Sequence, residues 1–169
     1  EPHHYGAWFG LAACFDGADR FDEALDAYDR AAAIEAGEAD LWMSRGDLLF
    51  SMGRLDEAIA SFETARALTP DDAETIGAIA AARFRNGDHP EAVALYERTI
   101  ALDPDWGRAH LGYACTLWAL GRERDALTSL GNAERIEIGS VAAFLLEYPE
   151  AAGHIVFEPS EADDDSEAR

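Results

Sequence analysis

Apolar positions recur along this chain with a period of 34 residues. One column of the repeat is small, and it contains Ala24, Ala58, Ala92 and Ala126. A bulky column follows four residues later, and it contains Tyr28, Phe62, Tyr96 and Leu130. In the other half of the period, Trp8, Leu11 and Phe15 have the spacing of the buried stripe of an α-helix. The pattern predicts two amphipathic helices in each period and an all-α fold.

Short polar breaks separate the two helices of each predicted pair. The breaks contain Gly53-Arg54, Asn86-Gly87 and Gly121-Arg122. Glycine and asparagine tolerate the left-handed backbone that commonly follows a helix end. Pro70 and Pro104 close two of the periods, and Asp71 and Asp105 after them suit the start of a following helix. We therefore expect short turns between antiparallel helices.

The repeat resembles the tetratricopeptide repeat, whose signature is W-x2-L-G-x2-Y, then A-x3-F and a closing proline. Its best match here is LWMSRGDLLFSMGRLDEAIASFETARALTPDD. The resemblance implies a right-handed α-α superhelix, a solenoid of antiparallel helix pairs. The predicted units are residues 5–38, 39–72, 73–106 and 107–140.

Three residues depart from the family pattern. Arg45 stands where leucine is usual, and His110 and Tyr113 replace tryptophan and leucine in the fourth unit. An unpaired charge on a buried stripe is costly. We therefore expect Arg45 to have a carboxylate partner or a route to solvent.

The segments outside the four units are expected to extend or end the array. Pro2 is in phase with Pro70 and Pro104, so residues 1–4 are interpreted as the end of a preceding repeat in a longer array. Residues 141–149 have helical spacing up to Pro149 and are expected to form a capping helix, with a docking helix for a partner as the alternative. Residues 150–169 are predicted to be an acidic, mostly disordered tail.

The charge of the chain limits its partners. It has 34 acidic residues against 13 basic ones, a formal net charge of −21, and all its bases are arginine. This charge disfavours nucleic acid, and the missing lysine excludes a Walker-A loop and a Schiff-base lysine. No apolar run approaches the roughly 20 residues of a membrane span, so no membrane partner and a cytoplasmic location are expected.

An acidic, lysine-free surface resembles that of proteins from halophilic organisms, in which salt screens the self-repulsion of the chain. We therefore expect the melting temperature, followed by circular dichroism, to rise from low to molar KCl. A melting temperature that is indifferent to salt would contradict the halophilic interpretation. The alternative is an ordinary acidic scaffold encoded by a GC-rich genome.

Enzyme chemistry has no signature in this sequence. It contains no GxSxG, HExxH, GxGxxG or CxxC motif, and its five histidines are scattered. Cys14 and Cys115 lie far apart without metal-ligand spacing around them. We predict a non-enzymatic protein with no cofactor and no metal.

The family resemblance implies a binding groove lined by the first helix of each unit. Carried over residue by residue, it predicts a peptide-binding groove of Phe9, Asp16, Met43, Asp47, Phe50, Phe84, Arg85, Arg108, Leu111 and Trp118. Phe50, Phe84 and Trp118 share one column, which predicts an aromatic ridge or, alternatively, framework packing between helices. The family's Lys and Asn clamp for chaperone C-termini is excluded, because this chain has no lysine and holds Asp47 or small residues where asparagine is needed.

The resulting functional hypothesis is a protein-protein interaction scaffold that binds a peptide segment or helix of a partner. Two alternatives are a targeting region of a larger enzyme such as a glycosyltransferase and a secretion-type chaperone. Self-association through an exposed N-terminal repeat face is a further expectation.

Overall fold

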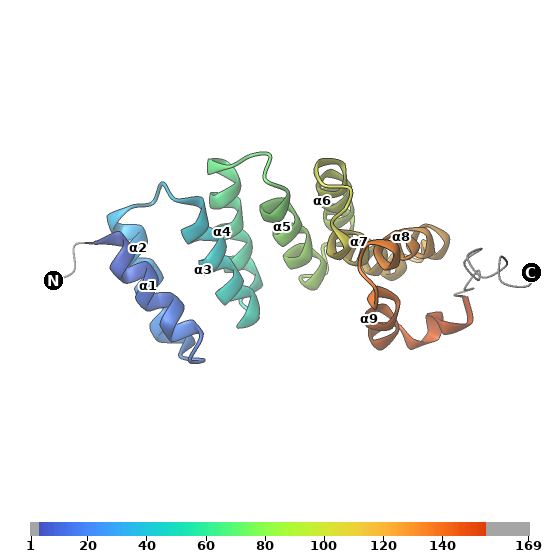
Figure 1. Cartoon of the computed structure of the whole chain (residues 1–169), viewed down its shortest axis with the longest axis horizontal. Coiled ribbons are helices and arrows are strands. Elements are labelled where there is room, and N and C mark those ends of the chain that lie inside the picture. The colour runs from blue at the N-terminus through green and yellow to red at the C-terminus, as the bar shows by residue number, and fades with distance from the viewer. Residues whose placement is uncertain (1–3, 155–169) are drawn as a thin grey trace, which may run out of the picture.

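The computed structural model describes residues 4–154, which form a row of paired helices. The helices are α1 (Tyr5–Asp16), α2 (Phe21–Ile34), α3 (Ala39–Ser51), α4 (Leu55–Leu68), α5 (Ala73–Arg85), α6 (His89–Leu102), α7 (Gly107–Ala119), α8 (Glu123–Ile136), α9 (Ser140–Glu147) and the 3-10 helix η1 (Pro149–His154). Figure 1 shows the array running from α1 at one end to α9 at the other. The described residues contain no strand, and the predicted α-α superhelix of antiparallel pairs is confirmed.

The repeating apolar columns form the core of the array. Ala24, Ala58, Ala92 and Ala126 are all fully buried. The bulky column is buried too, and two of its members show where it packs: Phe62 lies against Gly46 of α3 and Tyr96 against Gly112 of α7. Small residues let the backbones of paired helices approach each other closely. Gly46 is an example, because a Cβ atom at this position would clash with the ring of Phe62.

The turns between paired helices use the left-handed conformation that the sequence predicted. Gly53, Gly87 and Gly121 have φ angles of 75°, 87° and 73°. Asp19 holds the same column in the first unit and reaches φ 57° without being glycine. In the second unit, the backbone N–H of Arg54 donates to the Leu49 carbonyl at 2.9 Å, which satisfies one of the carbonyls left free at the helix end.

The start of α5 differs in detail from the expectation. Asp72, rather than Asp71, is the N-cap, and its carboxylate accepts a hydrogen bond from the Thr75 backbone N–H at 2.8 Å. At the start of α7 the N-cap position is Trp106, which makes no side-chain capping bond. The acids after the prolines therefore lie one residue too early to cap these helices.

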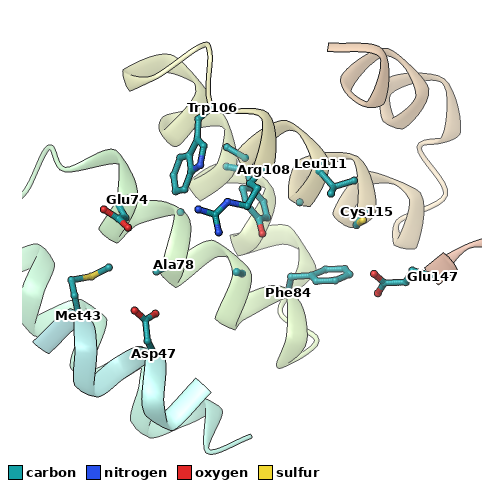
Figure 2. Close-up of a pocket in the computed structure, with 15 residues that line it drawn as sticks. Met43, Asp47, Glu74, Ala78, Phe84, Trp106, Arg108, Leu111, Cys115 and Glu147 are labelled. Atoms are coloured by element: carbon teal, nitrogen blue, oxygen red, sulfur yellow. The ribbon is translucent and has the colours of Figure 1, made fainter. Parts of the chain in front are cut away.

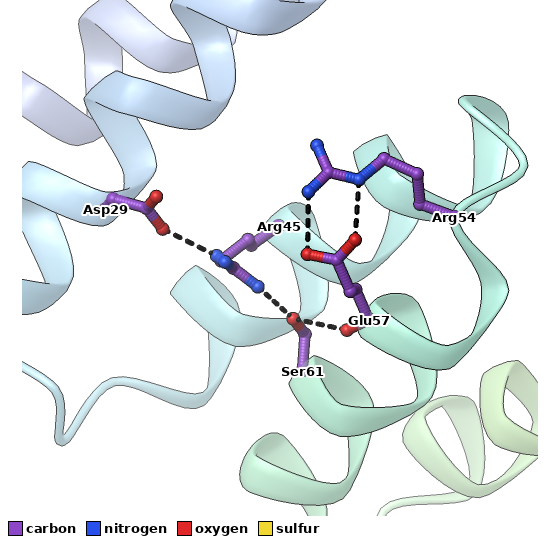
Figure 3. A network of polar contacts seen from close by, with 5 residues as sticks. All are labelled: Asp29, Arg45, Arg54, Glu57 and Ser61. Carbon is purple, nitrogen blue, oxygen red and sulfur yellow. Dashed lines mark hydrogen bonds and ion pairs between the residues drawn. The ribbon is translucent and has the colours of Figure 1, made fainter.

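Arg45 has the carboxylate partner that its position in the repeat required. Its Nε donates to Asp29 Oδ1 at 2.9 Å, across the junction between α2 and α3. Its Nη1 donates to Ser61 Oγ at 2.6 Å, and the Ser61 hydroxyl donates in turn to the Glu57 carbonyl at 3.1 Å. Figure 3 shows this chain of contacts beside the ion pair between Arg54 and Glu57. Since 18% of the Arg45 side chain remains exposed, the charge stays partly hydrated.

Replacing Arg45 with leucine, the residue usual in the repeat, is expected to leave the free energy of unfolding within about 1 kcal/mol of wild type or to raise it. Apolar packing commonly matches a partly buried ion pair, because the pair must first lose hydration. Asp29 is largely exposed and returns to water, and Ser61 keeps its bond to Glu57. Urea denaturation measures the change. A loss above about 2 kcal/mol would show that the ion pair itself is needed.

The C-terminal helix α9 covers the last helix pair. Phe144 is fully buried against α7, with its ring edge-on to Trp118 at a centroid distance of 5.5 Å. Residues 150–154, which the sequence placed in the tail, lie in η1. The rest of the predicted tail, 155–169, and residues 1–3 of the predicted preceding repeat lie outside the described residues.

Candidate functional site

The first helices of successive pairs form one wall of the array, and a cavity of about 440 Å³ opens between α3, α5 and α7. Figure 2 shows its lining. The side chains from α3 and α5 that line it include Met43, Asp47, Glu74, Ala78 and Phe84. Those from α7, its N-cap and α9 include Trp106, Arg108, Leu111, Cys115 and Glu147. Most of the lining residues are uncharged, and the four charged ones are Asp47, Glu74, Arg108 and Glu147.

A second cavity of about 500 Å³ continues the first towards α1. It is lined by Phe9 of α1, by residues of α3 and by the turn and first residues of α5. The two cavities share Met43, Asp47 and Glu74. They therefore form one continuous groove, which we call the α1–α7 groove.

Six of the predicted binding residues line the α1–α7 groove. Met43, Asp47, Phe84, Arg108 and Leu111 lie in the first cavity, and Phe9 lies in the second. The repeat period brings them together, because each residue lies on a first helix and in the same angular range of that helix. Equivalent repeat positions on the first helices therefore identified residues at the centre of the groove.

The other four predicted residues line neither cavity. The Arg85 guanidinium covers the Phe50 ring at 4.3 Å, and its Nη1 donates to the Phe50 carbonyl at 3.1 Å. The Trp118 indole packs against the ring of Phe144, and its Nε1 donates to Glu150 Oε1 at 3.3 Å. Asp16 lines neither cavity, but its carboxylate contributes to the raised pKa of Asp47. Of the three aromatics in the predicted ridge, only Phe84 lines the groove.

Several lining residues escaped the sequence prediction. Glu74 belongs to the same repeat column as Arg108, so applying that column to every unit would have found it. Trp106 precedes α7 and packs its ring over Gly77, where a Cβ atom would lie 2.6 Å from the ring. Glu147 comes from α9, which is outside the repeat. No periodic signal could place Trp106 or Glu147.

The charges around Asp47 are unfavourable to its ionised form. Partial burial in the groove raises the pKa of Asp47 above its ordinary value of 3.8, and the carboxylates of Glu74 and Asp16 raise it further.

Burial also raises the pKa of Cys115 to about 12, so this thiol stays protonated at neutral pH. Among residues 4–154, no group of three or more His, Cys, Asp or Glu side chains is placed to hold a metal ion.

Replacing Asp47 with asparagine is expected to raise the melting temperature slightly at neutral pH. An acid whose pKa is raised in the folded state binds its proton more tightly there, so its ionisation destabilises the fold above that pKa. The gain should shrink as the pH falls through the raised pKa, because wild-type Asp47 is then neutral as well. Thermal unfolding of both proteins across this pH range measures the difference. A variant less stable than wild type at neutral pH would contradict the prediction.

The family of the chain follows from sequence models as well as from this architecture. Two models, each described as tetratricopeptide repeat, match it: one over residues 37–105 and the other over residues 1–39 and 78–143. The chain belongs to the tetratricopeptide repeat family. No curated protein matches the sequence. None of the described helices of this tetratricopeptide repeat protein is long and apolar enough to cross a membrane.

Solved tetratricopeptide repeat structures share its fold at low sequence identity. A crystal structure of MamA has a TM-score of 0.76 at 18% identity, over 84% of this chain and 83% of that one. YrrB, described as a TPR protein with an unusual peptide-binding site, has a TM-score of 0.69 at 15% identity, over 89% and 80%. The first TPR of Spaghetti (RPAP3), bound to the HSP90 peptide SRMEEVD, has a TM-score of 0.67 at 21% identity, over 72% and 96%.

Proposed function

We propose that this protein is an interaction scaffold that binds a peptide segment of a partner protein in the α1–α7 groove. The observation that carries this proposal is the continuity of the groove, which joins two cavities of about 440 and 500 Å³ across the first helices of four pairs, α1, α3, α5 and α7. Apolar side chains such as Met43, Phe84 and Leu111 offer anchoring surface, and the charged lining residues can orient a bound peptide. A groove that continues from α1 to α7 suits several consecutive residues of a peptide better than a compact metabolite.

The comparisons support a protein or peptide as the ligand class. Two tetratricopeptide repeat proteins of similar fold are described with peptide binding, YrrB by its peptide-binding site and RPAP3 by its bound HSP90 peptide. The groove residues themselves do not favour catalysis. The Cys115 thiol is held protonated, and the carboxylates of Asp47 and Glu74 lie beside no histidine in the groove lining.

Selection from a random dodecapeptide library displayed on phage tests this proposal. Immobilised wild-type protein should enrich peptides with recurrent apolar residues, and Phe84→Ala should abolish most of that enrichment by removing an anchor surface. Leu102→Ala is the matched control, because Leu102 is 42% exposed and lies outside the groove. Circular dichroism confirms that both variants fold. Failure to enrich any peptide, or equal enrichment on wild type and Phe84→Ala, would refute groove binding.

A further inference from the structure

We infer that the peptide bound in the α1–α7 groove is basic: a Lys or Arg side chain lies against Asp47 and Glu74, and an apolar side chain enters the cavity beside Phe84 and Leu111. This inference rests on the proposed function and adds the chemistry of the partner. It comes from the distribution of charge along the groove, which differs between the groove's two cavities.

In the cavity nearest α1, every charged lining residue is acidic. Its charged lining residues are Asp40, Asp47, Asp72 and Glu74, and none of its lining residues is basic. Asp72 is already used, because it caps α5 through Thr75. Asp40, Asp47 and Glu74 have no ion pair with any described residue. A cationic side chain would supply the counter-charge that the protein itself does not provide here.

The apolar part of the groove adjoins this acidic cavity directly. Phe9 and Met43 line the acidic cavity, and Met43 also lines the next one with Ala78, Phe84 and Leu111. In Figure 2 the Asp47 carboxylate and the Met43 side chain point into the space in front of α5. A lysine or arginine has a long apolar stem with a charge at its tip, which matches apolar surface ending in carboxylates.

Arg108 is the single base among the described residues that line either cavity. It makes no hydrogen bond or ion pair with any residue in 4–154, and Figure 2 shows its guanidinium extending towards Ala78. Three carboxylates line the same cavity, those of Asp47, Glu74 and Glu147. The groove therefore has an excess of negative charge even where Arg108 reaches it, so a basic peptide is favoured over an acidic one.

The inference is tested by the composition of the selected dodecapeptides and by the affinity of one synthetic peptide from the enriched pool. Wild-type protein should enrich Lys and Arg over the input library, together with apolar residues. Asp47→Asn/Glu74→Gln should weaken binding of the synthetic peptide about tenfold, measured by isothermal titration calorimetry at fixed salt. Arg108→Ala should strengthen it. The acidic peptide SRMEEVD should show no measurable binding.

A matched control separates the groove from the general attraction of an acidic protein for cations. Asp22→Asn/Glu35→Gln removes the same charge from exposed positions outside both cavities and should change the affinity by less than about twofold. Equal weakening by the two double variants would overturn the inference, because attraction to the net charge of −21 would then explain binding. An enriched pool without excess Lys and Arg would overturn it too. In both cases the loss of binding in Phe84→Ala would still support peptide binding in the groove.

Discussion

Replacing Phe62 with alanine is expected to lower the free energy of unfolding by about 3 to 5 kcal/mol, because it empties a large space in a packed core. The ring is 1% exposed and belongs to a cluster that joins α3, α4 and α5 through Leu49, Ala58 and Ile79. Urea denaturation followed by circular dichroism measures the loss. A loss below about 1 kcal/mol would show that the surrounding helices close over the space.

A double-mutant cycle with Gly46 makes this prediction specific. Gly46→Ala alone should destabilise the fold, because the new methyl group would clash with the Phe62 ring. Once Phe62 is alanine the methyl group has room, and alanine also favours the helix over glycine by roughly 1 kcal/mol. The double variant should therefore be more stable than the sum of the single effects predicts, by at least about 1 kcal/mol. Simple additivity would contradict the proposed close contact.

Replacing Phe144 with alanine is expected to release α9 from the array. Phe144 is fully buried in a cluster with Cys115 and Leu130 and contacts the Trp118 ring. Loss of a buried phenylalanine costs about 3 to 5 kcal/mol. A helix of 8 residues has few other contacts to hold it on the array, so we expect this loss to exceed the free energy that keeps α9 docked. Hydrogen exchange followed by mass spectrometry should show loss of protection in residues 140–148 and weaker protection in α7.

Leu146 provides the control on the same helix. Its side chain is 88% exposed, so Leu146→Ala should leave the protection of α9 and α7 close to wild type. Protection of α9 that survives Phe144→Ala would show that the other contacts of α9 are sufficient to hold it. Equal loss in both variants would point to an effect on helix formation rather than on docking.

Much of the fold could be predicted because the repeat encodes it locally. The alanine column and the bulky column specify which faces of the second helices are buried, and Gly53, Gly87 and Gly121 specify where the chain turns. The prediction that Arg45 needs a partner was also correct, because the cost of burying a charge does not depend on which residue neutralises it. That the partner would be Asp29 could not be predicted, since it lies on another helix pair.

The candidate site was only half predictable, for a physical reason. A repeat column fixes the direction of a side chain from its own helix, so it placed Met43, Asp47, Phe84, Arg108 and Leu111 at the groove. The repeat column does not indicate which of these side chains are covered by another segment of the chain. Phe50 is covered by Arg85 and Trp118 by α9, whereas Glu147 enters the groove from outside the repeat.

The sequence alone determined the helix pairs, their turns and the buried columns of the second helices, because these depend on residues a few positions apart that recur with the period. The stripe predicted for the first helix was only partly right, since Leu11 is 39% exposed and Ala12 is the buried residue of α1. Only the tertiary structure decided which first-helix side chains remain open and which charges remain unpaired in the groove. These properties depend on how successive pairs stack and on where α9 folds back, and residues distant in the chain set both.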